Sequence, residues 1–203
     1  MKPKHKIALA CMAVLLVPLA AAEVVGDPTK AAPIVNSICI ACHGADGNGP
    51  VPIFPRLAGQ TADYLLKQLQ DFKKNKRQSE VMAPNAANLS DDDMANLAVF
   101  FAGQTAVPAP VGDPGLVAKG KKLFDEGNTT SGVPACSGCH GATGAGSPLY
   151  PRIAAQHVEY TLDQIKQFAT GKRKNDKRLM QTVASRLTED EIQAVAQYLA
   201  SLP

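Results

Sequence analysis

Apolar residues recur at helical spacing in two separate stretches of each half of the chain. The stretches 64–72 and 160–168 carry them three and four positions apart, and the stretches 94–101 and 192–199 repeat the pattern. Such spacing gathers apolar side chains on one face and predicts amphipathic helices. An alternation of apolar and polar residues long enough to predict strands does not occur. The sequence therefore predicts an all-α protein.

Capping residues mark where these helices, and an earlier helix in each half, begin. An N-cap side chain accepts from free N–H groups, proline is tolerated at the first helical position, and an acidic residue three positions later completes a capping box. Pro33 is expected to kink or delay the first helix, and Gly171 to stop the helix over 160–168. The predicted starts are Asp27-Pro28 and Asp113-Pro114 for the first helices, and Ser90 to Asp93 and Thr188 to Glu191 for the last.

The chain contains an internal repeat. The Cys-x-x-Cys-His motif at 39–43 recurs at 136–140, an offset of 97 residues, and further matches follow at offsets of 96 to 98. The second half carries 11 extra residues before its cysteines, and the segment 124–134 has the composition of an inserted loop. The predicted organisation is a signal peptide over 1–22, an N-terminal domain over 23–105, a stiff proline-containing linker over 106–112 and a C-terminal domain over 113–203.

The first 22 residues have the features of a secretory signal peptide. Lys2, Lys4 and Lys6 form a basic start, and the apolar run that follows is interrupted by Pro18 and ends in small residues at Ala22. Because the run is short for a membrane span, cleavage after Ala22 is favoured over an uncleaved anchor. Export to the periplasm is therefore expected.

Composition excludes several classes of protein. Of the 203 residues, 45% are hydrophobic, which is ordinary for a globular fold and too many for a disordered chain. Only one long apolar run exists, so a polytopic membrane protein is excluded. The formal net charge of +3 disappears once the three lysines of the signal peptide are removed. Bulk charge therefore gives no indication of nucleic acid as a partner.

The two Cys-x-x-Cys-His motifs point to covalent haem. In c-type attachment two thiols add to the haem vinyl groups, and the adjacent histidine supplies one axial ligand to iron. Redox-active Cys-x-x-Cys pairs follow strands, zinc would need ligands drawn from both halves, and disulfides alone do not need the histidine. Two covalently attached haem c groups are expected, one on Cys39, Cys42 and His43 and the other on Cys136, Cys139 and His140.

Methionine is the expected second axial ligand. Met82 and Met180 are equivalent in the repeat and lie 39 and 40 residues beyond their motif histidines, in irregular sequence before a capping box. A His/Met pair fills the iron coordination and raises its potential, which suits electron transfer. Met94 falls on an apolar helix stripe and is expected in the core. His157, whose counterpart is Thr61, is expected at the surface or at a helix entry, without a ligand role.

A proline and an arginine follow each motif. Pro55 lies 12 residues after the first motif histidine, and Pro151 lies 11 residues after the second. A ligating histidine usually donates its other ring N–H to a carbonyl, so a backbone acceptor is expected in each half. Arg56 and Arg152 could hold haem propionates through bidentate contacts. The alternative, a solvated arginine, is equally open.

Charged residues cluster at matching places in both halves. Basic residues gather over 73–77 and 172–178, and acidic residues over 91–93 and 189–191. Such a distribution could steer the encounter with an acidic partner. Compensation of helix dipoles explains the same clusters and is the favoured interpretation.

With these motifs the chain resembles the class I cytochromes c, and more closely the dihaem cytochrome c4 family. The resemblance covers nearly all of the chain after residue 22 and includes both haem motifs, both Pro-Arg segments and the paired methionines. It implies two tandem all-α class I domains whose haems lie near the domain interface with their propionates facing each other. It also implies that the carbonyls of Pro55 and Pro151 accept the histidine N–H.

The resemblance further implies a periplasmic electron carrier rather than an enzyme. A quinol–cytochrome c reductase or a dehydrogenase would be its donor and a terminal oxidase its acceptor, and some members associate peripherally with the membrane. The residues leave a second role open, that of haem subunit in a periplasmic dehydrogenase for sulfide, thiosulfate or an alcohol. A dihaem peroxidase is disfavoured because both ligand positions are filled.

Overall fold

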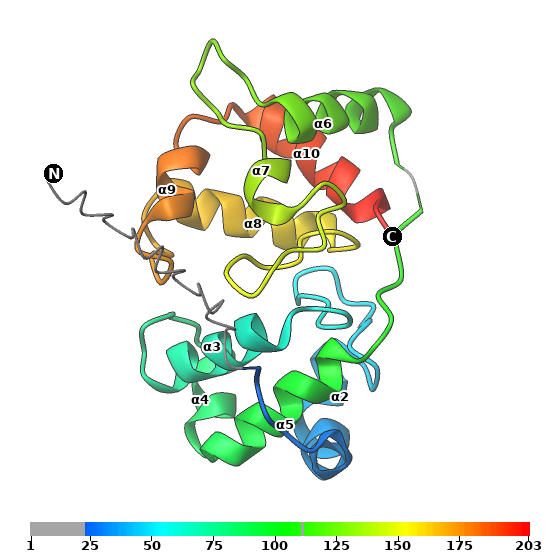
Figure 1. Ribbon diagram of the computed structural model, residues 1–203, viewed down its shortest axis with the longest axis vertical. Helices are drawn as coiled ribbons and strands as arrows, with labels where there is room; N and C mark the ends of the chain where they lie inside the picture. Colours follow the sequence, from blue (N-terminus) through cyan, green and yellow to red (C-terminus); the bar gives the residue numbers. More distant parts are fainter. Residues whose placement is uncertain (1–22, 111) are drawn as a thin grey trace, which may run out of the picture.

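The computed structural model describes residues 23–110 and 112–203, and the expected signal peptide lies outside them. Two helical domains are stacked along the long axis of the molecule and are joined by the linker at one side (Figure 1). Loops of the two domains face each other across the middle of the molecule. The prediction of an all-α fold with two tandem domains is confirmed.

The helices follow the repeat. In the first domain they are a 3-10 turn Pro28–Ala31, α1 Ala32–Ile34, a π-helical turn Val35–Cys39, α2 Ile40–His43, α3 Ala62–Lys73, α4 Met82–Ala87 and α5 Asp91–Ala102. In the second they are α6 Pro114–Glu126, α7 Ser137–His140, α8 Val158–Ala169, α9 Leu179–Ala184 and α10 Glu189–Ser201. Among the described residues β structure is limited to one isolated bridge, Asn128–Val133. No helix within these ranges is both long and apolar enough to cross a membrane.

Capping residues begin the helices where the sequence predicts. Before α5, the Ser90 hydroxyl accepts from the Asp93 N–H at 3.0 Å, while the Asp93 carboxylate accepts from the Ser90 N–H at 2.9 Å. Thr188 forms the same reciprocal box before α10. Asp27 and Asp113 cap the first helix of each domain with their side chains. These local signals position the helices that frame each site.

Two expectations about the first helices need correction. Pro33 lies inside a continuous helical path that passes from 3-10 through α to π geometry, so of the two expected effects the delay is wrong, and the helix instead changes pitch around the proline. The Ser37 hydroxyl donates to the Pro33 carbonyl at 2.7 Å within this path. The loop expected over 124–134 is wrong at its start, because buried Phe124 belongs to the last turns of α6. The loop begins at Gly127, whose φ of +71° ends the helix.

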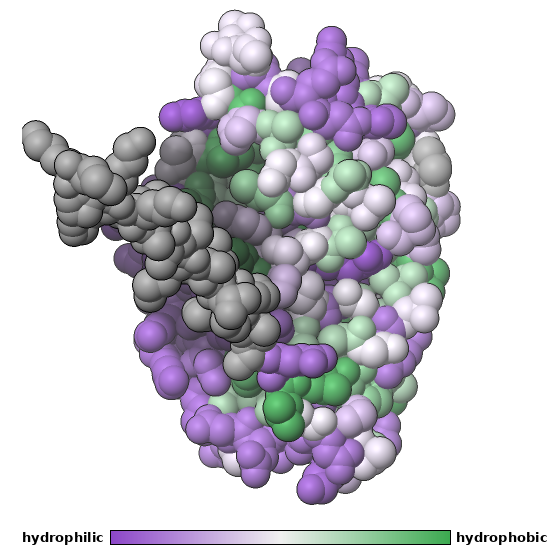
Figure 2. Space-filling view, in the orientation of Figure 1, coloured by the Kyte–Doolittle hydropathy of each residue, from purple (hydrophilic) through white to green (hydrophobic). Residues whose placement is uncertain are grey.

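Each domain has its own apolar core. The first core consists of Ala31, Val35, Leu65, Leu89, Met94, Leu97, Ala98 and Phe101. The second consists of Leu123, Phe124, Val133, Ile165, Phe168, Ala184, Ile192, Val195, Tyr198 and Leu199. The helix α6 crosses α10 closely at Gly120, where a Cβ atom would lie 2.0 Å from the Ala194 carbonyl oxygen. On the outside, polar side chains gather at both ends of the face seen in Figure 2, and apolar side chains form smaller groups.

The linker is fastened by both domains. The Asn48 side chain, in the loop after α2, donates to the Thr105 carbonyl at 2.9 Å and accepts from the Val107 N–H at 3.0 Å. Further along, the Ala109 N–H donates to the Ala200 carbonyl at 2.9 Å. The connection therefore adds fixed contacts between the domains rather than a free tether.

Candidate haem-binding sites

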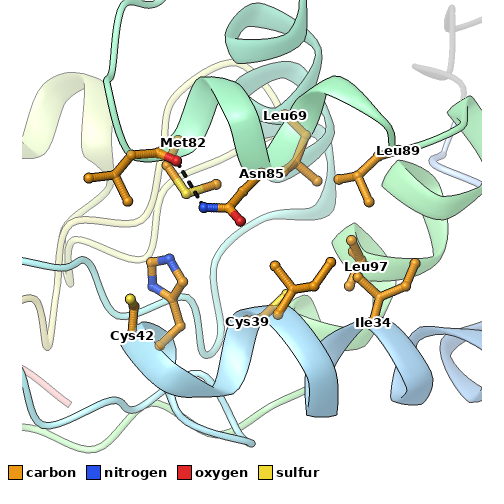
Figure 3. A pocket seen from close by; sticks show the side chains of 11 residues that line it. Ile34, Cys39, Cys42, Leu69, Met82, Asn85, Leu89 and Leu97 are labelled. Atoms are coloured by element: carbon orange, nitrogen blue, oxygen red, sulfur yellow. Dashed lines mark hydrogen bonds between the residues drawn. The ribbon is translucent and has the colours of Figure 1, made fainter.

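The first Cys-x-x-Cys-His motif lies against an apolar pocket. Cys39 and Cys42 are one helical turn apart, with His43 at the end of α2, and Met82 lies across the pocket from them at the start of α4 (Figure 3). The pocket is partly open to solvent, and most of its lining side chains are apolar, as in cofactor sites. The remaining lining residues are Ile34, Ile38, Leu69, Val81, Asn85, Leu89 and Leu97.

Both motif histidines are oriented by a proline carbonyl. The distance from His43 Nδ1 to the Pro55 carbonyl oxygen is 2.8 Å, and that from His140 Nδ1 to the Pro151 oxygen is 2.9 Å. A carbonyl can only accept, so Nδ1 carries the proton and Nε2 is left with a free lone pair for a metal. Burial lowers the pKa of both histidines more than these hydrogen bonds raise it, which favours the neutral form that ligates.

An aromatic ring beside each histidine extends this support. Phe54 lies edge-on to the His43 ring at 6.2 Å, and Tyr150 lies edge-on to the His140 ring at 6.1 Å. Each aromatic residue directly precedes the supporting proline, so one short segment fixes the imidazole by a hydrogen bond and by packing. The matched Phe/Tyr-Pro-Arg segments of the repeat are the signal in the sequence that could have identified these two rings.

A glycine directly after each histidine turns the chain. Gly44 has a φ of +74° and Gly141 a φ of +81°, a backbone conformation that L side chains rarely adopt. The turn is closed by a hydrogen bond from the Gly49 N–H to the His43 carbonyl at 2.7 Å, and by an equivalent bond from Gly146 to His140 at 2.8 Å. The two loops therefore return to their histidines in the same way, as their matching glycines allow.

The cysteines have the chemistry that thioether formation needs. All four described cysteines are free, so neither motif is closed by a disulfide. Burial raises the pKa of Cys39 to about 11 and that of Cys136 to about 11. Both groups are therefore free thiols at neutral pH, and attachment would join each sulfur to a haem vinyl carbon. The side chains present thus fit a covalently attached haem.

Met180 has a position similar to that of Met82. It lies near the start of α9 and packs, with Cys136, against the core of the second domain. Met94, in contrast, is 1% exposed within the first core, which agrees with its expected packing role. The structure therefore brings Met82 to the first motif and Met180 to the core that holds the second.

The two arginines lie between the expected alternatives. Arg56 donates through Nη1 to the carbonyls of Val107 and Ala155, so it is not simply solvated. The Nε atoms of Arg56 and Arg152 are buried without a hydrogen-bond partner. A buried donor without an acceptor is costly, and an anionic group such as a haem propionate would satisfy it.

The expectation for His157 is partly wrong. It is the N-cap residue of α8, as expected for a helix entry, but only 8% of its surface is exposed. Its Nε2–H donates to the Gly49 carbonyl of the other domain at 2.8 Å. The domain interface buries it, and interfaces between distant segments leave no trace in local sequence.

Known proteins match both halves of the chain. The model of the cytochrome c family matches residues 29–103 and 117–203. Cytochrome c4 of Thiocapsa roseopersicina is 47% identical over 187 residues, which are 90% of this chain and 96% of that protein. A protein of Thiomonas intermedia described as a thiosulfate dehydrogenase electron acceptor is 40% identical over 179 residues, 85% of this chain and 82% of its own length.

A solved structure supports the same assignment. The crystal structure of reduced recombinant cytochrome c4 from Pseudomonas stutzeri aligns with a TM-score of 0.84 at 38% identity, covering 88% of this chain and 100% of that chain. Together with two motif histidines that are bonded to carbonyls through Nδ1 and lie beside free cysteines, these matches decide family, cofactor and general role. The chain belongs to the cytochrome c4 family of dihaem cytochromes c, electron carriers with two covalently attached haem c groups per chain.

Proposed function

We propose that this chain carries electrons in the periplasm from a quinol–cytochrome c reductase or a dehydrogenase to a terminal oxidase. When bound, each haem supplies a site for one electron, with iron cycling between the ferrous and ferric states. His43 and Met82 would ligate the first iron, and His140 and Met180 the second. The thiols of Cys39, Cys42, Cys136 and Cys139 would attach the two groups, and Arg56 and Arg152 would hold propionates.

The observation that carries this proposal is the orientation of both motif histidines. Each Nδ1–H donates to a proline carbonyl, at 2.8 Å for His43 and 2.9 Å for His140, and leaves Nε2 available. A ring held in this way keeps its geometry when the charge on a bound metal changes, so little reorganisation accompanies electron transfer. The apolar lining around Met82 offers few hydrogen-bond partners to water in the same space.

A second candidate function is supported by the Thiomonas intermedia relative. The Thiomonas intermedia protein takes electrons from thiosulfate dehydrogenase, according to its description. A role as electron acceptor or haem subunit of a periplasmic dehydrogenase oxidising thiosulfate, sulfide or an alcohol uses the same two sites. Purification of the native protein distinguishes the roles, because a subunit co-purifies with its dehydrogenase and a free carrier does not.

The test of the ligand assignment is the reaction of the reduced protein with carbon monoxide. The unaltered protein is expected to show no CO difference spectrum, because His43 with Met82 and His140 with Met180 would leave no position open to CO. Met82→Ala and Met180→Ala are each expected to bind one CO per chain. Met94→Leu, a change in the core of the first domain, is the control and should bind none. Uptake of CO by the unaltered protein would contradict the assignment.

A further inference from the structure

The segment that leads to each methionine is tied to the opposite domain. Arg77 lies between α3 and Met82, and its Nη2 donates to the Tyr160 hydroxyl and to Gln164 Oε1, both at 2.8 Å. Its Nη1 donates to Gln68 Oε1 of its own domain at 2.9 Å. One guanidinium therefore joins the methionine segment of the first domain to α8 of the second.

Arg173 of the second domain makes the equivalent contacts to the first domain. Arg173, between α8 and Met180, donates through Nη2 to the Tyr64 hydroxyl at 2.6 Å and to Gln68 Oε1 at 3.2 Å. Its Nη1 donates to Gln164 Oε1 of its own domain at 2.6 Å. The two glutamine oxygens are thus shared by both guanidinium groups, and the two arginines form one connected cluster.

Each arginine is also fixed within its own domain. The Arg77 guanidinium carbon lies 4.7 Å from the centre of the Phe72 ring, and that of Arg173 lies 4.4 Å from the centre of Phe168. Arg173 is only 6% exposed. A buried guanidinium needs its hydrogen bonds, and its planar fork lets one side chain bridge several acceptors. The stacking therefore aims both forks across the interface.

The segment between α8 and Met180 makes additional hydrogen bonds to the first domain. Asn175 Nδ2 donates to Gln68 Oε1 at 3.0 Å and to the Asp71 carboxylate at 2.7 Å, both on α3 of the other domain. The next residue, Asp176, accepts from the Met180 N–H at 2.7 Å. Asn175 and Asp176 are neighbours in sequence, and together they link α3 of the first domain to the backbone of Met180.

The histidine side of each site is held in the same reciprocal manner. The Gln60 side chain accepts from the Arg152 N–H and donates to its carbonyl, both at 2.8 Å. Gln156 accepts from the Arg56 N–H at 2.9 Å and donates to its carbonyl at 3.1 Å. Arg56 and Arg152 directly follow the prolines that orient the histidines. Support from the other domain thus reaches both axial-ligand segments of each site.

From these contacts we infer that the methionine of each haem site is kept on its iron by the opposite domain, with Arg77 and Arg173 as the positioning residues. The inference rests on the proposed ligation by Met82 and Met180. Loss of a methionine requires its segment to swing away, and that movement breaks charge-assisted hydrogen bonds to the other domain. A competing ligand should therefore displace each methionine less easily in the two-domain chain than it would if the contacts from the opposite domain were absent.

Binding of imidazole to the oxidised, fully haem-loaded protein tests the inference. In this experiment NMR would follow the methyl signal of the ligating methionine at each haem. Met82→Ala and Met180→Ala would assign the two signals. Arg173→Gln is expected to raise the imidazole affinity of the second haem about tenfold or more, and Arg77→Gln that of the first, because each removes several charge-assisted bonds. Arg186→Gln, which loses a bond only within the second domain, should change neither affinity.

The tyrosines provide the decisive variants, because they are mild changes located in the other domain. Tyr64→Phe, in the first domain, is expected to raise imidazole affinity at the second haem several-fold, and Tyr160→Phe at the first. An effect of each tyrosine on the haem of its own domain, or on neither haem, would overturn the inference. Absence of ligating-methionine signals in the unaltered protein would instead refute the proposed ligation, before any variant is compared.

Discussion

The two domains arrive at their haem motifs by different routes. In the first, a continuous helical path runs from Pro28 into the motif, with π geometry at Val35–Cys39. In the second, α6 ends at Glu126, and a loop closed by the Asn128–Val133 bridge comes before the motif. From the motif onward the domains agree in the glycine turn, the proline acceptor and the reciprocal contacts. The geometry of the site therefore depends on the segment after the cysteines, and the segment before them can be either a helix or a loop.

The two domains differ in single residues that the repeat places at equivalent positions. Asn85 lines the first pocket and bonds to the Val81 carbonyl at 2.8 Å, where the second domain has Val183. Thr61 begins α3 with a buried hydroxyl that lacks a hydrogen-bond partner, whereas His157 begins α8 with a bond to the other domain. These differences make the two halves unequal in polarity and in their contribution to the interface.

The largest effect is expected from removing one pair of cysteines. Cys39→Ala with Cys42→Ala should leave one haem per chain and unfold much of the first domain, because its apolar pocket loses its filling. The equivalent double change at Cys136 and Cys139 should cost less helix, since a loop separates that motif from α6. Haem content and far-ultraviolet circular dichroism measure both. Equal, native-like helix content in the two variants would show that entry route and haem filling do not matter to folding.

A smaller effect is expected from His157→Thr, which copies Thr61 into the second domain. Loss of the buried bond to Gly49 should lower the free energy of unfolding by about 1–3 kcal/mol near pH 7.5. Thr61→Val is the control, and since that hydroxyl has no partner, stability should hold or rise slightly. Urea unfolding of the haem-loaded proteins gives both values.

The advantage conferred by His157 is also expected to depend on pH. Burial, assisted by the charge of Arg56, lowers the pKa of His157 in the folded protein more than its bond to Gly49 raises it. The unfolded chain takes up the proton first as pH falls through about 6.5, so stability present above that pH is lost below it. The difference between the unaltered protein and His157→Thr should therefore shrink from pH 7.5 to pH 5.5. A constant difference would mean that His157 does not titrate on unfolding.

The smallest effect is expected from exchanging Asn85 and Val183, which the repeat places at equivalent positions. Asn85→Val makes the first pocket more apolar and should raise the potential of the first haem by a few tens of millivolts, because a less polar site favours the ferrous state. Val183→Asn should lower the potential of the second haem. Potentiometric titration measures both, and Asn88→Val, on an exposed residue outside the pocket, should leave both potentials unchanged. A lowered potential in Asn85→Val together with a raised potential in Val183→Asn would exclude polarity as the cause.

Most of the fold could be predicted from the sequence because its signals are local. Capping boxes, apolar stripes and the Cys-x-x-Cys-His spacing each lie within a few residues, and the structure has the predicted caps at Ser90 and Thr188. The acceptors Pro55 and Pro151 were found through the repeat and the family resemblance. The burial of His157 and the cross-domain partners of Arg77 were not, because they depend on how two finished domains meet. No periodicity along the chain encodes that orientation.

Gln60 and Gln156 make equivalent bonds in opposite directions across the interface, so one sequence pattern used twice specifies both sets of contacts. Residue i of one domain contacts residue j of the other, and j of the first contacts i of the second, as in the isologous contact of a twofold-symmetric homodimer. One domain's sequence thus specifies both halves of the contact, and fusion into a single chain removes its dependence on concentration. Bonds without a counterpart, such as those of His157 and Asn175, are then the places where the two copies have become different subunits of one molecule.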